Sequence, residues 1–137
     1  MSKLSAFLKP AVAAEEKEIV VSRRFLDENG EPAKFKIRAL TQEENEKITK
    51  AATRTVKVNG QPAERVDRGE LSRRIVLAGT VEPDFSSKEM CGAYGTMDPL
   101  EVPGKMLYSG EYSVLLSEIM SLSGFDMTDL GDEAKNS

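Results

Sequence analysis

Residues 20–44 constrain the fold of this chain more than any other segment, because they predict a β-hairpin that leads directly into a capped helix. Residues 19–25 and 35–40 are two β-prone runs in which side chains two positions apart share a face. Residues 27–32, DENGEP, predict a turn, since Asn and Gly accept positive φ at low cost and Pro cannot donate to a ladder. We therefore expect two antiparallel strands.

The hairpin is followed by a helix-start signal. Thr41 lies three residues before Glu44, which is the spacing of a capping box. The threonine hydroxyl and the glutamate carboxylate can then satisfy N–H groups that the first helical turn leaves without partners. This pattern predicts a helix that begins after Thr41 and continues to about Arg54.

A second hairpin and a second helix are predicted next. Residues 55–58 and 63–66 flank the turn sequence NGQP at 59–62. Asp67 and Glu70 repeat the capping spacing and predict a helix through Ala78, with Gly79 as its C-cap. Leu71, Ile75 and Ala78 share one side of that helix, as in an ordinary amphipathic pattern.

Short helices and one long helix are predicted in the C-terminal half. Ser86 or Ser87 can cap a helix over residues 88–94, and Asp98-Pro99 starts another short piece. After Ser109 the apolar residues recur at spacings of three and four, which predicts a core-forming helix that Gly124 ends. The members of this stripe are Tyr112, Leu115, Leu116, Ile119, Met120 and Leu122.

The predicted fold class is α+β, with a small antiparallel β-hairpin or sheet followed by a mostly helical C-terminal two-thirds. A chain of 137 residues favours one domain. We expect an N-terminal arm at residues 1–17, a single α+β domain at 18–125 and a flexible acidic tail at 126–137. The arm can either pack on the domain or be held out for a partner, and the sequence favours neither outcome.

Composition and charge disfavour nucleic-acid-binding, membrane and secreted proteins as classes for this chain. The net charge of −4 and the pI of about 5.0 disfavour nucleic acid as a partner. No apolar run approaches the roughly 20 residues that span a bilayer, and no secretion signal is evident, so we expect a cytoplasmic, soluble protein without a membrane partner. A local basic cluster at and just before the second helix is better interpreted as a solvated face than as an RNA contact; it comprises Arg65, Arg68, Arg73 and Arg74.

Catalysis has little support in the sequence. The chain contains no His, which is the commonest general base near neutral pH and the commonest transition-metal ligand. Cys91 is expected to be a small buried hydrophobe within a helix, and no glycine motif matches a phosphate-binding loop. The carboxylates of Glu15-Glu16, Glu43-Glu44 and the acidic tail fall in segments expected to face water. We therefore predict no enzyme activity, no catalytic residue, no metal site and no cofactor.

A series of short motifs, none specific alone, occurs in an order that resembles one family. The motifs are LSAFLKP at residues 4–10, the hairpin and helix cap at 20–44, VEPDF at 81–85, AYG at 93–95, LYSGEY at 107–112 and LSGF at 122–125. In this order they resemble the XkdN-like tail assembly chaperones of phages and defective prophages, over almost the whole length of the chain.

The resemblance implies a chaperone that binds the tape measure protein during tail morphogenesis, with the tail tube protein as a further candidate partner. Self-association is left open. Two alternatives are a structural tail component that stays in the mature particle and a small hydrolase with Asp or Glu metal ligands. Exposed apolar side chains would provide the partner-binding surface, and we predict six of them: Leu4, Phe7, Leu8, Tyr112, Leu116 and Met120.

Overall fold

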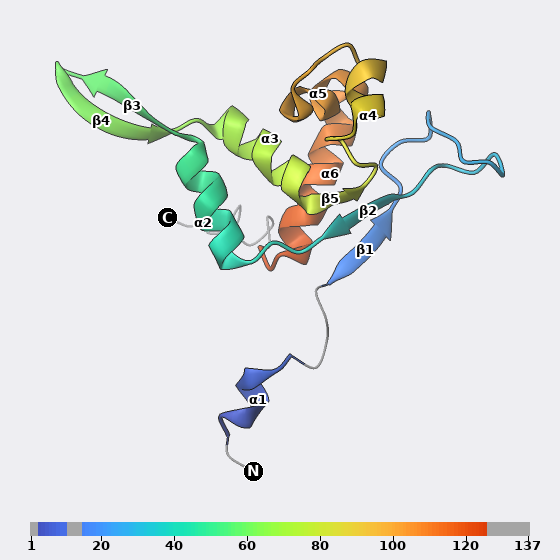
Figure 1. Cartoon of the computed structure of the whole chain (residues 1–137), viewed down its shortest axis with the longest axis horizontal. Helices are drawn as coiled ribbons and strands as arrows, with labels where there is room; N and C mark the ends of the chain where they lie inside the picture. Colours follow the sequence, from blue (N-terminus) through green and yellow to red (C-terminus); the bar gives the residue numbers. More distant parts are fainter. Residues whose placement is uncertain (1–2, 11–14, 126–137) are drawn as a thin grey trace, which may run out of the picture.

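A computed structural model describes residues 3–10 and 15–125, which form an α+β fold (Figure 1). The predicted fold class is thus confirmed. Three antiparallel strands form one sheet in the order β1-β2-β5, and β3 and β4 form a separate hairpin. Helices α3, Arg68–Gly79, and α6, Ser109–Leu122, pack against the sheet, and shorter helices cover one end. The predicted tail at 126–137 lies outside the described residues.

The sheet is centred on β2, Phe35–Arg38. On one side it pairs with β1, Glu16–Ile19, with Glu16 opposite Arg38 and Ile19 opposite Phe35. On the other side it pairs with β5, Thr80–Glu82, through a register shift between Lys36 and Ile37. Phe35 and Ile37 point into the core, as the period-two pattern of this strand predicts.

The prediction for the first strand was wrong in position. The strand occupies Glu16–Ile19 and not residues 19–25, so it begins inside the segment expected to be an arm. After Ile19 the chain leaves the ladder, because Val21 and Ser22 turn into the core and Arg24 reaches across to α6. The turn at 27–32 is confirmed: Asp27 accepts hydrogen bonds from the N–H groups of Asn29 and Glu31, and Gly30 has φ +78°.

The capping box at the start of α2, Gln42–Ala51, is confirmed. The Glu44 N–H donates to Thr41 Oγ1 at 3.2 Å, and the Thr41 N–H donates to Glu44 Oε1 at 3.1 Å. Arg38 at the end of β2 also donates to Glu44, which links strand and helix. The helix ends at Ala51, short of the predicted Arg54, because the next strand already begins at Thr53.

The second predicted hairpin is present and protrudes from the body (Figure 1). It consists of β3, Thr53–Val58, and β4, Gln61–Val66, and its turn has positive φ at Asn59 and Gly60. Glu70 of α3 holds its base, since this buried carboxylate accepts hydrogen bonds from Arg54 of β3 and Arg74 of α3. A buried charge needs such partners to offset its desolvation.

The predicted short helical pieces are also present. They are α4, Lys88–Ala93, the 3-10 turn η1, Pro99–Glu101, and α5, Val102–Met106. Ser87, not Ser86, caps α4 by accepting the N–H of Met90 at 3.2 Å. Val102 and Met106 of α5 join the core, as does Phe85, which precedes α4. The remaining short helix, α1, Ser5–Leu8, precedes β1 and contains no buried residue.

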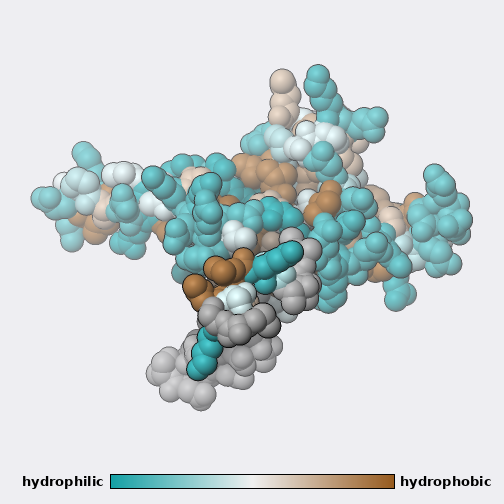
Figure 2. Space-filling model, turned by 60° about the horizontal axis from the view of Figure 1, so that its bottom comes forward, coloured by the Kyte–Doolittle hydropathy of each residue, from teal (hydrophilic) through white to brown (hydrophobic). Residues whose placement is uncertain are grey.

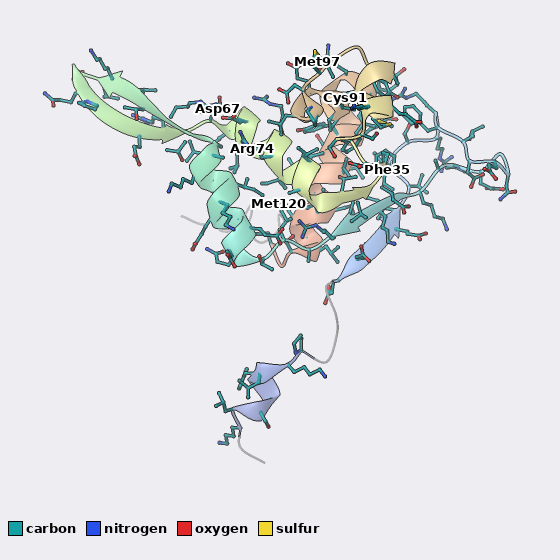
Figure 3. All side chains as sticks on the ribbon, viewed as in Figure 1. Phe35, Asp67, Arg74, Cys91, Met97 and Met120 are labelled. Carbon is teal, nitrogen blue, oxygen red and sulfur yellow. The ribbon has the colours of Figure 1, made fainter. Side chains whose placement is uncertain are left out.

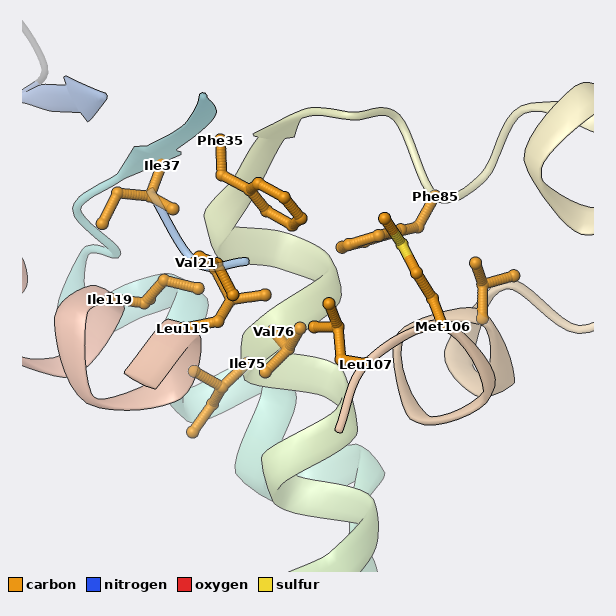
Figure 4. Close-up of a cluster of buried hydrophobic side chains, with 11 residues drawn as sticks. Val21, Phe35, Ile37, Ile75, Val76, Phe85, Met106, Leu107, Leu115 and Ile119 are labelled. Atoms are coloured by element: carbon orange, nitrogen blue, oxygen red, sulfur yellow. The ribbon is translucent and has the colours of Figure 1, made fainter. Parts of the chain in front are cut away.

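The core is formed where α3, Arg68–Gly79, and α6, Ser109–Leu122, meet the inner face of β2 (Figure 4). Leu115 and Ile119 of α6 are fully buried, which confirms the predicted core stripe of this helix. Burial of each stabilises the fold by about 1.5–3 kcal/mol. The side chains of the cluster are Val21, Phe35, Ile37, Ile75, Val76, Phe85, Val102, Met106, Leu107, Leu115 and Ile119.

Gly79 ends α3 for a reason other than the one predicted. Its backbone does not have the positive φ of a glycine C-cap, and the residue is buried. A Cβ at this position would lie 2.5 Å from Cγ2 and 2.9 Å from Cδ1 of Ile119. The absence of a side chain therefore allows α3 and α6 to approach each other at the core.

Gly79→Ala should destabilise the protein by about 1–3 kcal/mol, because the added methyl group overpacks a core that is already close-packed. Denaturant unfolding followed by circular dichroism measures the change. Gly92→Ala is the matched control, since this α4 glycine has open space where a Cβ would stand. The control should be neutral or stabilising. Equal stability of the two variants would contradict the role assigned to Gly79.

Candidate partner-binding surface

The first candidate surface is the apolar side of α1. Leu4, Phe7 and Leu8 are 63%, 85% and 71% exposed, so none of the three packs on the domain. Figure 1 shows α1 projecting away from the sheet, and Figure 2, which turns this side toward the viewer, shows apolar surface gathered on the projecting segment. Within the described part of the predicted arm, α1 has no buried residue, whereas Glu16 and Lys17 pair with β2.

The second candidate surface is a groove between α3 and α6, which we call the α3–α6 groove. Leu116 and Met120 of α6 form one wall, and Leu71 and Ile75 of α3 form the other. Arg68 and Ser72 complete the lining, and the groove has a volume of about 170 Å³. Figure 3 labels Met120. Two of the predicted partner-binding residues thus share one concave, mainly apolar site.

Tyr112 does not belong to this groove. Its hydroxyl lies 3.3 Å from the hydroxyl of Ser72, so it joins α6 to α3. Its ring is partly buried against the core and lines a different cavity of about 290 Å³, together with Leu107 and Ser109. The structure therefore divides the six predicted residues into three places: the α1 surface, the α3–α6 groove and the contact made by Tyr112.

An ordered cluster around Arg24 was missed by the sequence analysis. The Arg24 guanidinium lies 3.9 Å from the centre of the Tyr108 ring and 4.8 Å from that of Phe25. It donates to Glu111 from Nε at 3.3 Å and from Nη2 at 2.5 Å, and to the Met106 carbonyl at 3.1 Å. These contacts pin the segment after β1 to the start of α6.

The Arg24 cluster explains the electrostatics of Glu111. Hydrogen bonds from Arg24, and secondarily from Ser22, lower the pKa of the Glu111 carboxyl to about 2. Glu111 also accepts the N–H of Tyr108 at 2.8 Å, which completes the first turn of α6. A carboxylate held in this way stabilises a helix start and is poorly suited to accept a proton near neutral pH.

Features typical of catalysis are scarce within residues 3–10 and 15–125. No group of three or more Cys, Asp or Glu residues there is placed to hold a metal ion. A cavity of about 660 Å³ lies between α2 and the β3–β4 hairpin, and the residues that line it are of polar or charged types. Cys91 is half-buried, as a structural cysteine would be, and its thiol points to the Phe85 carbonyl at 3.6 Å.

The described helices include none long and apolar enough to cross a membrane.

Comparison with known proteins identifies the family. The model of the phage XkdN-like tail assembly chaperone family matches residues 4–135. The chain belongs to this family. Among curated relatives, the phage-like element PBSX protein XkdN of Bacillus subtilis (strain 168) is 35% identical over 129 residues, which cover 91% of this chain and 87% of the relative. The uncharacterized protein YqbN of the same strain is 36% identical over the same shares.

The tail assembly chaperone fold is also seen in a solved relative. A crystal structure of the protein YqbN matches with a TM-score of 0.73 and 31% identity, over 88% of this chain and 96% of that chain. The family match begins at Leu4, so residues 4–17 of the predicted arm fall within it. The resemblance stated from the sequence motifs is thereby confirmed.

The lowered pKa of Glu111 predicts an acid-sensitive contribution to stability. Its carboxyl has a pKa of about 2 in the folded chain and an ordinary value of 4.5, so below pH 4.5 the unfolded chain binds this proton more readily. The stabilisation is present above pH 4.5 and is lost as pH falls toward 2. Glu111→Gln should therefore flatten the decline in unfolding free energy over this range, measured by urea unfolding at several pH values.

Glu44 provides a second carboxyl with a pKa lowered to about 2, chiefly by Arg38, so Glu111→Gln should remove part of the acid sensitivity and not all of it. The matched control is Glu28→Gln, which changes an exposed carboxylate in the turn. A variant at Glu111 with the same pH dependence as wild type would contradict this account of the Arg24 cluster.

Proposed function

We propose that this tail assembly chaperone binds the tape measure protein in the cytoplasm of the host cell and shields its apolar segments until the tail polymerises. The tail tube protein is a second partner in this proposal. The observation that carries it is the exposure of Leu4, Phe7 and Leu8 at α1, in a segment that the family model matches. The function requires no catalytic residue, cofactor, nucleic acid or membrane.

The physical basis is the cost of leaving apolar surface in water. Contiguous exposed apolar residues commonly mark sites of protein interaction, and burial of one large side chain contributes about 1.5–3 kcal/mol. Phe7 is the most exposed of the three arm residues, so it has the most area to lose on binding. A partner with its own apolar helical face would fit such a segment.

The arm and the α3–α6 groove would contribute differently. The arm, proposed as residues 1–17, can reach a partner from outside the domain, although its last two residues already pair in β1. Leu116 and Met120 are half-buried, so they offer a shallow apolar site on a rigid helix. We assign initial capture to the arm and a second contact to the groove. Tyr112 contributes by joining α3 to α6.

The arm can be tested by co-purification. Phe7→Ala combined with Leu8→Ala should weaken binding to the tape measure protein by at least about tenfold, because two anchor side chains are truncated. Met97→Ala is the control, since Met97 is 97% exposed and lies in the segment between α4 and η1. Unchanged affinity of the arm variant, measured by titration calorimetry, would remove the arm from the proposal.

A chaperone and a structural tail component differ in their fate. The proposal expects this protein to leave before the tail is complete, so quantitative mass spectrometry of mature particles should not detect it in fixed stoichiometry. A constant copy number per particle would instead support the structural alternative and contradict chaperone release.

A further inference from the structure

The α3–α6 groove has a positively charged residue, Arg68, at its rim, and no carboxylate of the described residues pairs with it. Arg54 and Arg74 are both paired with Glu70, whereas Arg68 is exposed and has no hydrogen bond or ion pair with any described residue. Arg68 nevertheless lines the same groove as Leu71, Ile75, Leu116 and Met120. An apolar floor beside one free guanidinium suits a peptide that combines large apolar residues with carboxylates.

The described chain ends beside this groove. Gly124 has φ +98°, and the N–H of Phe125 donates to the Met120 carbonyl at 2.9 Å, so the end of α6 folds back on its own last turn. Phe125 and Met120 then line a cavity of about 160 Å³ next to Leu40 and Asn45. Met120 therefore lines both the cavity beside Phe125, where the described chain ends, and the α3–α6 groove.

The sequence that follows Phe125 combines apolar residues with carboxylates, which is the composition expected of a peptide that fits this groove. Residues 126–137 include the apolar residues Met127 and Leu130, and they carry four acidic residues, Asp126, Asp129, Asp132 and Glu133, against one lysine. The five residues from 126 to 130 can span about 16 Å when extended. This reach is sufficient for Leu130 to arrive at a groove that Met120 itself lines.

We propose that the C-terminal segment 126–137 docks in the α3–α6 groove of its own chain, with Leu130 on the apolar floor and its carboxylates near Arg68. The groove is thus a binding site for an acidic, leucine-containing peptide, and the chain supplies its own ligand. Docking would cover Leu116 and Met120. A tail protein that uses these residues, as the proposed function has it, would need to displace the segment.

Paramagnetic relaxation enhancement on the full-length chain tests this inference without any partner, so its outcome is independent of the proposed function. A nitroxide is attached at Asn136→Cys in a Cys91→Ser background. The methyl signals of Leu71, Ile75, Leu116 and Met120 should broaden strongly. Those of Val56 and Val58, on the protruding hairpin, should not. Uniform broadening, or none in the groove, would overturn the proposal.

Two variants show which interactions hold the segment. Leu130→Asp should lower the ratio of docked to free segment by more than about tenfold, since a buried leucine is lost. Arg68→Glu should lower it roughly two- to fivefold, as expected for one exposed charge pair. Arg23→Glu, at an exposed residue far from the groove in sequence, is the charge-matched control and should have no effect. Broadening that survives Leu130→Asp would also contradict the docking.

A mixing experiment separates docking within one chain from docking between copies. Isotope-labelled chains without nitroxide are mixed with unlabelled chains that carry it. Broadening in the groove should disappear in this mixture. Persistent broadening would mean that the segment binds a second copy, which would overturn the assignment to the same chain.

Discussion

The close approach of α3 and α6 is the constraint on which the rest of this structure depends. Gly79 allows Ile119 to contact the α3 backbone, and the two helices then present Val76 and Leu115 to the inner face of β2. The same helix pair forms the α3–α6 groove, in which Leu71 of α3 and Met120 of α6 are only half covered. Core packing and the candidate binding site are therefore consequences of one helix pair.

Local signals in the sequence were sufficient for much of this architecture. The Thr41–Glu44 capping box and the turn at 27–32 involve neighbouring residues, so their geometry is largely independent of the remainder of the fold. The stripe of α6 was also predictable, since a run of apolar residues at helical spacing has few alternatives to burial. Leu115 and Ile119 lie at the centre of the core for this reason.

The features that were missed depend on partners distant in the sequence. β1 is an edge strand of mostly charged, exposed residues, so no alternation of apolar side chains marks it, and its position is set by pairing with β2. Arg24 pairs with Glu111, 87 positions away, and no local pattern connects them. Likewise, the apolar stripe of α6 did not reveal that Tyr112 bonds to Ser72 while Leu116 faces the groove.

The charged edge strand of the sheet affects how this protein can expose the apolar side chains of α1 without self-association. Glu16, Lys17 and Glu18 line the outermost strand, and Lys17 reaches Glu118 of α6 at 3.1 Å. Charges at an open strand edge discourage strand-to-strand stacking between molecules. The apolar side chains of α1 can thus stay exposed while the charged edge strand that follows it in the sequence disfavours edge-to-edge association between molecules.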